Sequence, residues 1–124
     1  VDDELLLEQY QSILLTMDME RIESGGSSRK WNRLVDKLQG VQLALRTSPA
    51  GRTGISALIG TDNATVSLWS ATFALSWDPE PARAELERLA GGAGLLAFEA
   101  EVTLKEFDAG RLNTLWVPKT PGKG

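Results

Sequence analysis

Carboxylates are the residues of this sequence whose spacing comes nearest to a chemical site. Glu99 and Glu106 lie seven residues apart, on one face of an expected helix, and Glu101 precedes Lys105 by four residues. Such groups could transfer protons or hold a metal ion. The same spacings are typical of a solvated helix surface with ordinary ion pairs, and we favour that interpretation.

The absence of histidine removes most other catalytic chemistry. Without it there is no neutral-pH general base of the usual kind, no Ser-His-Asp arrangement and no histidine zinc ligand. Cysteine is also absent, which excludes disulfides and thiolate chemistry. The glycines at 25–26 are followed by serines and basic residues, and the glycines at 91, 92 and 94 lie between two expected helices without a preceding strand, so neither group fits a phosphate-binding loop. We therefore expect no catalytic residue, no metal and no cofactor; an enzyme using carboxylates, lysine or Tyr10 is the third-ranked hypothesis.

A basic cluster, RKWNR, holds the candidate contacts Arg29, Lys30 and Arg33 around an aromatic ring. Bases beside an aromatic residue are typical of a nucleic-acid surface. Trp31, however, falls on the apolar stripe of its helix, and the formal net charge of -4 gives no general attraction to phosphate. We expect no nucleic-acid partner and keep the three bases as candidate contacts for a protein.

The four tryptophans raise the question of an exposed aromatic anchor. Periodicity places Trp31 and Trp69 in the interior. Trp77 and Trp116 are the candidates for a partner-binding surface, although we favour a role in covering the open ends of the helical stack.

The first half of the chain predicts three helices. The first begins at Asp2 or Asp3, ends near Ile22 and is acidic. After the flexible stretch SGGSS (24–28) comes a basic second helix, expected beside the first. Its stripe has spacings of three and four: Trp31, Leu34, Val35, Leu38, Val41, Gln42 and Leu45. With Ser48 as N-cap and Pro49 at the first helical position, a third helix runs to a left-handed Gly60.

The second half predicts three more helices and an irregular tail. Val66 to Leu75 is apolar on nearly every side, which indicates a buried central helix capped by Asp62 or Asn63. Asp78 and Pro79 begin the fifth helix, which ends at the glycines 91–92. The sixth follows Gly94, closes near Gly110 and has these apolar residues: Leu95, Leu96, Phe98, Val102, Leu104 and Phe107. In the tail we expect Leu115 and Trp116 against the core, with the last five or so residues loose.

These elements predict an all-α protein of about six helices, as an irregular bundle or as three stacked antiparallel pairs. Residues 50–77 and 79–110 each read as helix, turn, helix, which favours the pairs. We expect a single domain over 1–112 and an irregular tail over 113–124. The central helix is too short to cross a bilayer, and no basic-then-apolar leader follows Val1. The absence of cysteine suits the cytoplasm, so we expect a cytoplasmic protein without a membrane segment.

The stretch Leu58 to Leu75, LIGTDNATVSLWSATFAL, resembles the turn and second helix of a HEAT repeat. HEAT repeats often carry arginine after the valine, where this sequence has Ser67. Together with GLLAFEAEVTLKEF (94–107) and GRL (110–112), residues 3–112 resemble a small uncharacterised bacterial family, a domain of unknown function with a HEAT-like or armadillo-like α-α superhelix. The resemblance, strongest over 55–112, implies this fold and no activity.

Function is therefore expected from a surface rather than from a catalytic centre. The leading hypothesis is a non-enzymatic protein-interaction module, either an adaptor or an immunity-type binder. The alternative is a small-ligand binding or sensing protein with an apolar pocket near Trp77, Phe98 and Trp116. Self-association stays open, because a short solenoid has apolar ends.

Overall fold

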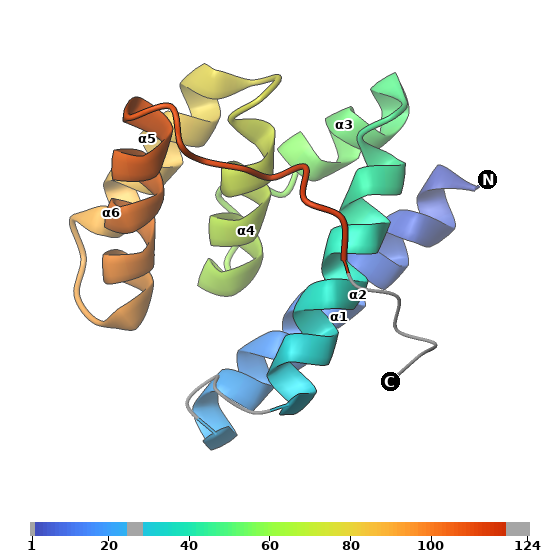
Figure 1. The fold of residues 1–124 in the computed structure, drawn as a ribbon, viewed down its shortest axis with the longest axis horizontal. Coiled ribbons are helices and arrows are strands. Elements are labelled where there is room, and N and C mark those ends of the chain that lie inside the picture. Colours follow the sequence, from blue (N-terminus) through green and yellow to red (C-terminus); the bar gives the residue numbers. More distant parts are fainter. Residues whose placement is uncertain (1, 25–28, 119–124) are drawn as a thin grey trace. The chain divides into compact units, whose positions relative to one another are not determined.

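The computed structural model describes residues 2–24 and 29–118 of the 124-residue chain. Within these ranges it contains six helices and no strand, which confirms the all-α prediction (Figure 1). The helices are α1 (Asp3–Ser24), α2 (Arg29–Leu45), α3 (Pro49–Ser56), α4 (Ala64–Ala74), α5 (Pro79–Ala90) and α6 (Leu95–Asp108). In the described ranges no helix combines the length and apolarity needed to cross a membrane. The expected break at 25–28 and the end of the tail lie outside the described residues.

The chain forms two compact units, and the boundary between them falls within α3. Unit 1 contains α1, α2, the start of α3 and the tail from Leu115; unit 2 is Arg52–Thr114 and contains α4, α5 and α6. The single domain over 1–112 stays a prediction.

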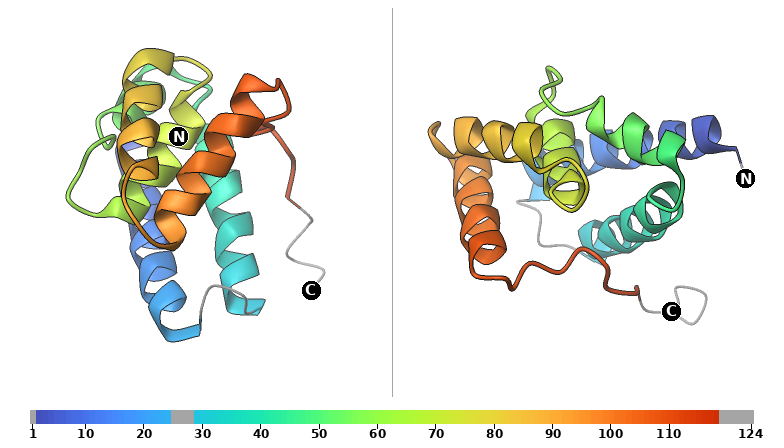
Figure 2. Two further views of the ribbon diagram at one scale, coloured as in Figure 1. Left: turned by 90° about the vertical axis from the view of Figure 1, so that its left-hand side faces the viewer. Right: turned by 90° about the horizontal axis from the view of Figure 1, so that it is seen from above.

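Unit 1 is built on an antiparallel pair, α1 with α2 (Figures 1 and 2). Side chains on both helices are fully buried: Tyr10, Leu14 and Met17 on α1, and Leu38 and Leu45 on α2. The Asp2 carboxylate accepts a hydrogen bond from the Glu4 amide at 2.9 Å, so the predicted cap of the first helix is confirmed. Lys30 Nζ lies 3.5 Å from Glu20 Oε1, which places the basic helix beside the acidic one as expected.

A chain of buried amides connects α2 to the tail. Arg46 Nη1 donates to Gln42 Oε1 at 3.2 Å, Gln42 Nε2 donates to Gln39 Oε1 at 3.0 Å, and Gln39 Nε2 donates to the Trp116 carbonyl at 2.7 Å. Burial lowers the pKa of Arg46. The tail is therefore held at Trp116, whereas the expectation for Leu115 is wrong because its side chain is exposed.

The start of α3 matches the prediction, and its end does not. Ser48 Oγ accepts from the Gly51 amide at 3.0 Å, the expected N-cap contact. The helix ends at Ser56 rather than at Gly60, because tighter turn bonds such as Ile59 N to Ser56 O (3.1 Å) follow it. Gly60 does take the predicted left-handed conformation, with φ 86°.

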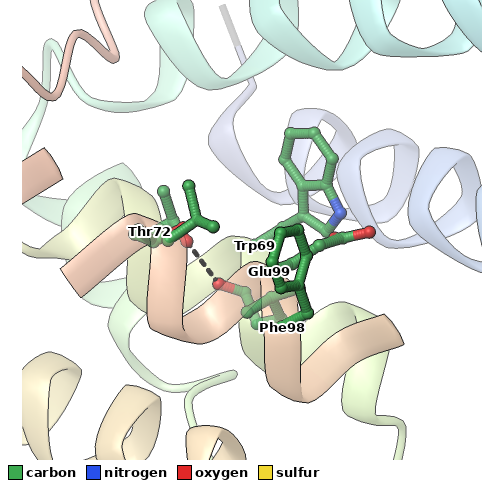
Figure 3. Close-up of a pocket in the computed structure, with 7 residues that line it drawn as sticks. Trp69, Thr72, Phe98 and Glu99 are labelled. Carbon is green, nitrogen blue, oxygen red and sulfur yellow. Dashed lines mark hydrogen bonds between the residues drawn. The ribbon is translucent and has the colours of Figure 1, made fainter. Parts of the chain in front are cut away.

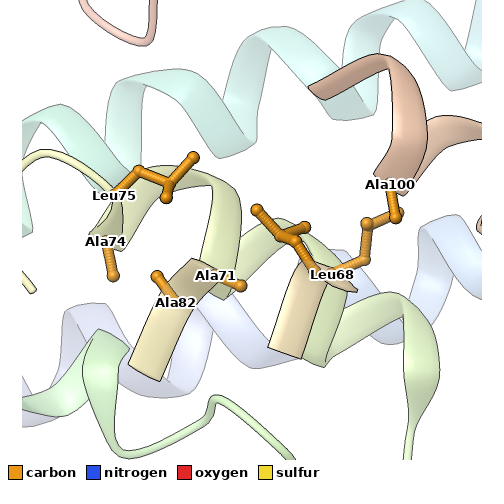
Figure 4. Close-up of a cluster of buried hydrophobic side chains, with 7 residues drawn as sticks. Leu68, Ala71, Ala74, Leu75, Ala82 and Ala100 are labelled. Atoms are coloured by element: carbon orange, nitrogen blue, oxygen red, sulfur yellow. The ribbon is translucent and has the colours of Figure 1, made fainter. Parts of the chain in front are cut away.

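In unit 2, α4 packs against both α5 and α6, which also pack on each other. Asn63 Oδ1 caps α4 by accepting from the Val66 amide at 3.1 Å. The buried cluster consists of small and branched apolar side chains: Leu68, Ala71, Ala74, Leu75, Ala82, Leu86 and Ala100 (Figure 4). The alanines let the helices approach closely. Because α4 packs against both other helices and most of its residues are buried, the central position predicted for it is confirmed within this unit.

The expected cap of α5 by Asp78 is wrong. Its side chain makes no capping hydrogen bond, and its backbone (φ -142°, ψ 62°) lies outside the extended geometry of an N-cap. Pro79 still begins the helix, since its ring presets the helical φ and it has no amide to satisfy.

Candidate functional site

A pocket of about 310 Å³ lies between α4 and α6 in unit 2 (Figure 3). Seven residues line it: Leu68, Trp69, Thr72, Phe98, Glu99, Val102 and Thr103. We call this hollow the α4–α6 pocket. Its walls are mainly apolar, with two threonines and one carboxylate among them, a composition typical of a site that takes an apolar group.

The α4 side of the pocket is set by Trp69 and Thr72. Thr72 Oγ1 donates to the Leu68 carbonyl at 2.8 Å, so its hydroxyl is engaged by its own helix (Figure 3). The Trp69 ring lies 6.0 Å from the Phe73 ring at an angle of 49°. Trp69 is half-buried rather than interior as expected, because one part of its ring lines the pocket.

Trp69 also has a buried polar atom. Its Nε1 is shielded from solvent and has no hydrogen-bond partner among the described residues. The indole therefore presents an apolar surface to this wall, and its unpaired buried N–H lowers the stability of the fold by about 1–3 kcal/mol, the usual desolvation cost of such a group.

The α6 side of the pocket exists because this helix has two apolar stripes. Ala97 and Ala100 are buried, and Leu96, Leu104 and Phe107 pack against the buried cluster. Leu95, Phe98 and Val102 instead have exposed fractions of 50, 60 and 40%. Their spacings of three and four place them on one face of the helix. We call these three residues the α6 seam; two of them, Phe98 and Val102, also line the pocket.

Ion pairs flank the far end of α6. Arg83 Nη1 lies 2.7 Å from Asp108 Oδ1, and Arg111 Nη2 lies 2.9 Å from Glu106 Oε2. Each guanidinium lowers the pKa of the carboxyl group that it binds, through hydrogen bonds and charge. Glu101 is exposed and makes no ion pair within the described part of the chain.

The structure places the predicted anchor Trp77 away from the pocket. Its Nε1 donates to Ser56 Oγ at 3.0 Å, and the half-buried ring packs against the buried cluster of unit 2. Trp116 belongs to unit 1, where its carbonyl is bound by Gln39. Of the three residues expected around an apolar pocket, only Phe98 lines this one.

The basic cluster lies at the start of α2 in unit 1. Arg29, Lys30 and Arg33 are exposed, and Lys30 pairs with Glu20. Trp31 is half-buried rather than interior as expected, and the Arg21 guanidinium stacks over its ring at 5.0 Å from the centroid. The stacking joins α1 to α2 and leaves three bases on the surface.

Sequence reasoning missed the pocket-lining roles of Trp69, Thr72 and Thr103. It also did not separate the α6 seam from the core stripe of the same helix. The spacing of Leu95, Phe98 and Val102 was a readable signal, but only the position of α4 shows which stripe is covered.

Comparison with solved structures finds the same fold in a bacterial protein. The chain is similar to the protein RPA1889 from Rhodopseudomonas palustris CGA009, with a TM-score of 0.80 and 22% sequence identity. The match covers 91% of this chain and 93% of the other. No protein-family model and no curated protein matches the chain.

At this level of identity the similarity shows the fold alone. The all-α architecture is thus shared with a crystallographically determined bacterial protein. Membership of the small bacterial family and the HEAT-like character of the helix pairs stay predictions.

Proposed function

We propose that this chain is a non-enzymatic protein-interaction module that binds its partner through the α6 seam and the adjoining α4–α6 pocket. The observation that supports this is the row of large apolar side chains left exposed beside an apolar hollow. Single exposed apolar residues are ordinary, but a contiguous set next to a pocket is typical of a binding surface.

A pocket beside an apolar row can receive a protein partner better than a flat apolar surface can. Phe98 and Trp69 are aromatic, and aromatic residues are enriched in the energetically important centres of interfaces. An apolar side chain from the partner can enter the pocket while the rest of its segment lies on Leu95 and Val102. An adaptor and an immunity-type binder both remain within this proposal.

The proposal includes a HEAT-like arrangement of the helices and a cytoplasmic location. The packing of α1 on α2 and of α5 on α6 is consistent with a short HEAT-like α-α superhelix. A cytoplasmic location suits a chain without cysteine.

Affinity capture with seam variants tests the proposal. The bait would be the whole chain, as wild type and as Phe98→Ser, and the captured proteins would be identified by mass spectrometry. We expect a stoichiometric partner with the wild type that is lost with Phe98→Ser. Because Phe98 is exposed, the substitution should leave the fold intact, which circular dichroism would verify.

Met19→Ser is the matched control, since Met19 lies on α1 and is 61% exposed. Its bait should retain the partner. If Phe98→Ser and a Leu95→Ser, Phe98→Ser double variant both capture as much of the partner as the wild type does, the α6 seam is excluded as the binding surface.

The pocket volume supports a second candidate function, binding of a small apolar ligand. About 310 Å³ lies at the lower end of the range for small-ligand sites. A screen of small apolar compounds should then raise the melting temperature of the wild type but not of Val102→Trp, which fills the pocket. If no compound raises the melting temperature of the wild type more than that of Val102→Trp, the ligand hypothesis is wrong.

A further inference from the structure

The α6 seam has the spacing of a helix-packing seam. Leu95, Phe98 and Val102 are separated by three and then four residues, as at positions a, d and a of a heptad. Lys105 takes the next d position and ends the apolar part. Two turns of exposed apolar surface along a helix match the apolar face of a second helix laid against it.

The positions on either side of the seam are acidic. In the heptad that begins at Leu95, positions e and g are occupied by Glu99, Glu101, Glu106 and Asp108. Arg111 and Arg83 already bind Glu106 and Asp108 at the far end. Glu101, beside Phe98 and Val102, is exposed and makes no ion pair within the described residues. Charges at e and g select the partner helix, so this flank favours a basic one.

The surrounding charge has the same sign. Residues 52–114 contain nine acidic and five basic residues, which gives this segment a formal charge of -4. The whole chain also has a formal net charge of -4, so its excess negative charge lies in this segment. A negative field of this kind accelerates the approach of a positively charged segment and repels an acidic one.

A second copy of the chain is a poor occupant. In both parallel and antiparallel helix pairs, the e and g residues of one helix face e or g residues of the other. Two α6 helices would therefore oppose acidic residues to acidic residues along the seam.

From this pattern we infer that the partner segment is an amphipathic helix whose apolar stripe is flanked by lysine or arginine. The inference rests on the proposed function, because it names the segment that enters the α6 seam. The contact is about two turns long, which is small for a stable interface, so the affinity of the isolated segment is on the order of micromolar.

Three fluorescein-labelled model peptides test the inference by fluorescence anisotropy with the full chain. All are helical 18-residue sequences, a length of about 27 Å. The first has leucine at a and d and lysine at e and g; the second keeps the leucines and has glutamate at e and g; the third keeps the lysines and has serine at a and d. The titrations would use about 50 mM salt, where surface charges are weakly screened.

We expect the leucine–lysine peptide to bind at least about tenfold more tightly than either of the others. Glu101→Lys should abolish or reverse the preference for lysine over glutamate flanks. Glu80→Lys makes the same change of charge at an exposed site on α5 and should keep the preference.

Each other outcome counts against the inference in a distinct way. Equal binding of the lysine- and glutamate-flanked peptides, lost for both in Phe98→Ser, would overturn the charge selection and leave the proposed function standing. Equal binding of the serine-seam peptide would show non-specific attraction between charges and overturn it as well. If no peptide binds up to about 1 mM, the helical occupant is wrong. The capture experiment then decides the proposed function separately.

Discussion

At the scale of single residues, Glu85 joins three segments of unit 2. Ser67 Oγ donates to its Oε2 at 2.6 Å, and the same hydroxyl accepts from the Gly60 amide at 2.7 Å. Arg88 adds two hydrogen bonds, Nε to Oε1 at 2.8 Å and Nη2 to Oε2 at 2.7 Å. The turn before α4, the helix α4 and the helix α5 are thereby connected through one carboxylate that is only 8% exposed.

Replacing this carboxylate should cost stability. We expect Glu85→Gln to lower the free energy of unfolding by about 1–2 kcal/mol, because charge-assisted hydrogen bonds are lost in a buried position. This loss of unfolding free energy is small because the Arg88 side chain is largely exposed and water can solvate its charge once the carboxylate is gone. Urea unfolding measures it, with Glu87→Gln as control. Glu87 binds Arg83 on the surface, so its variant should unfold at the wild-type urea concentration, and an equal loss in both would refute this role of Glu85.

The same residue makes a prediction about acid stability. Hydrogen bonds from Arg88, supported by that from Ser67, hold the pKa of Glu85 below its ordinary value of 4.5 against the opposing effect of burial. A carboxyl group whose pKa is lower in the folded state stabilises that state above the unfolded pKa, and this contribution disappears as the pH falls. The difference in unfolding free energy between wild type and Glu85→Gln should thus be constant near neutral pH and shrink below about pH 4.5. A difference that grows in acid would contradict the assignment.

At the scale of elements, two glycines of unit 1 should respond oppositely to the same substitution. Gly40 lies within α2, is exposed, and has no atom within 4 Å of where a Cβ would stand. Gly51 lies in the first turn of α3, where a Cβ would stand 1.9 Å from the Leu45 carbonyl oxygen. One site has room for a methyl group, and the other is a close approach of two backbone segments.

Gly40→Ala should therefore stabilise the protein by about 0.5–1 kcal/mol through helix propensity. Gly51→Ala should destabilise it by about 1–3 kcal/mol or more, because the backbone between α2 and α3 must shift. Thermal unfolding of the two variants would show melting temperatures on opposite sides of the wild type. Shifts of the same sign would contradict the close approach at Gly51.

At the scale of the whole molecule, the charge pattern predicts a monomer. The acidic flanks of the α6 seam oppose pairing of two α6 helices, and the net charge of -4 adds a general repulsion. Light scattering at about 100 μM protein and low salt should give a mass near 13.5 kDa. A mass of twice this value that returns to the monomer in Phe98→Ser would show instead that the seam is a self-association surface.

Local signals in the sequence were sufficient for most helix boundaries. Asp2, Ser48 and Asn63 each accept the capping hydrogen bond expected from their type and position. Gly60 takes the left-handed conformation expected of a glycine that closes a turn. Such contacts join residues two or three apart, so the chain needs no distant segment to form them. Asp78 failed as a cap because its backbone conformation is not determined by residue type alone.

The sequence by itself thus determined the helical class, most of the helix starts and the apolar character of α4, since these follow from residue type and short-range spacing. Only the tertiary structure decided which stripe of α6 is covered, that Glu85 is bound by Ser67 and Arg88, and that Trp69 lines a pocket. Periodicity shows which side chains share a face of a helix, but it does not show which neighbouring helix covers that face. The exposed seam, on which the proposed function depends, is the apolar part of α6 that α4 and α5 leave uncovered.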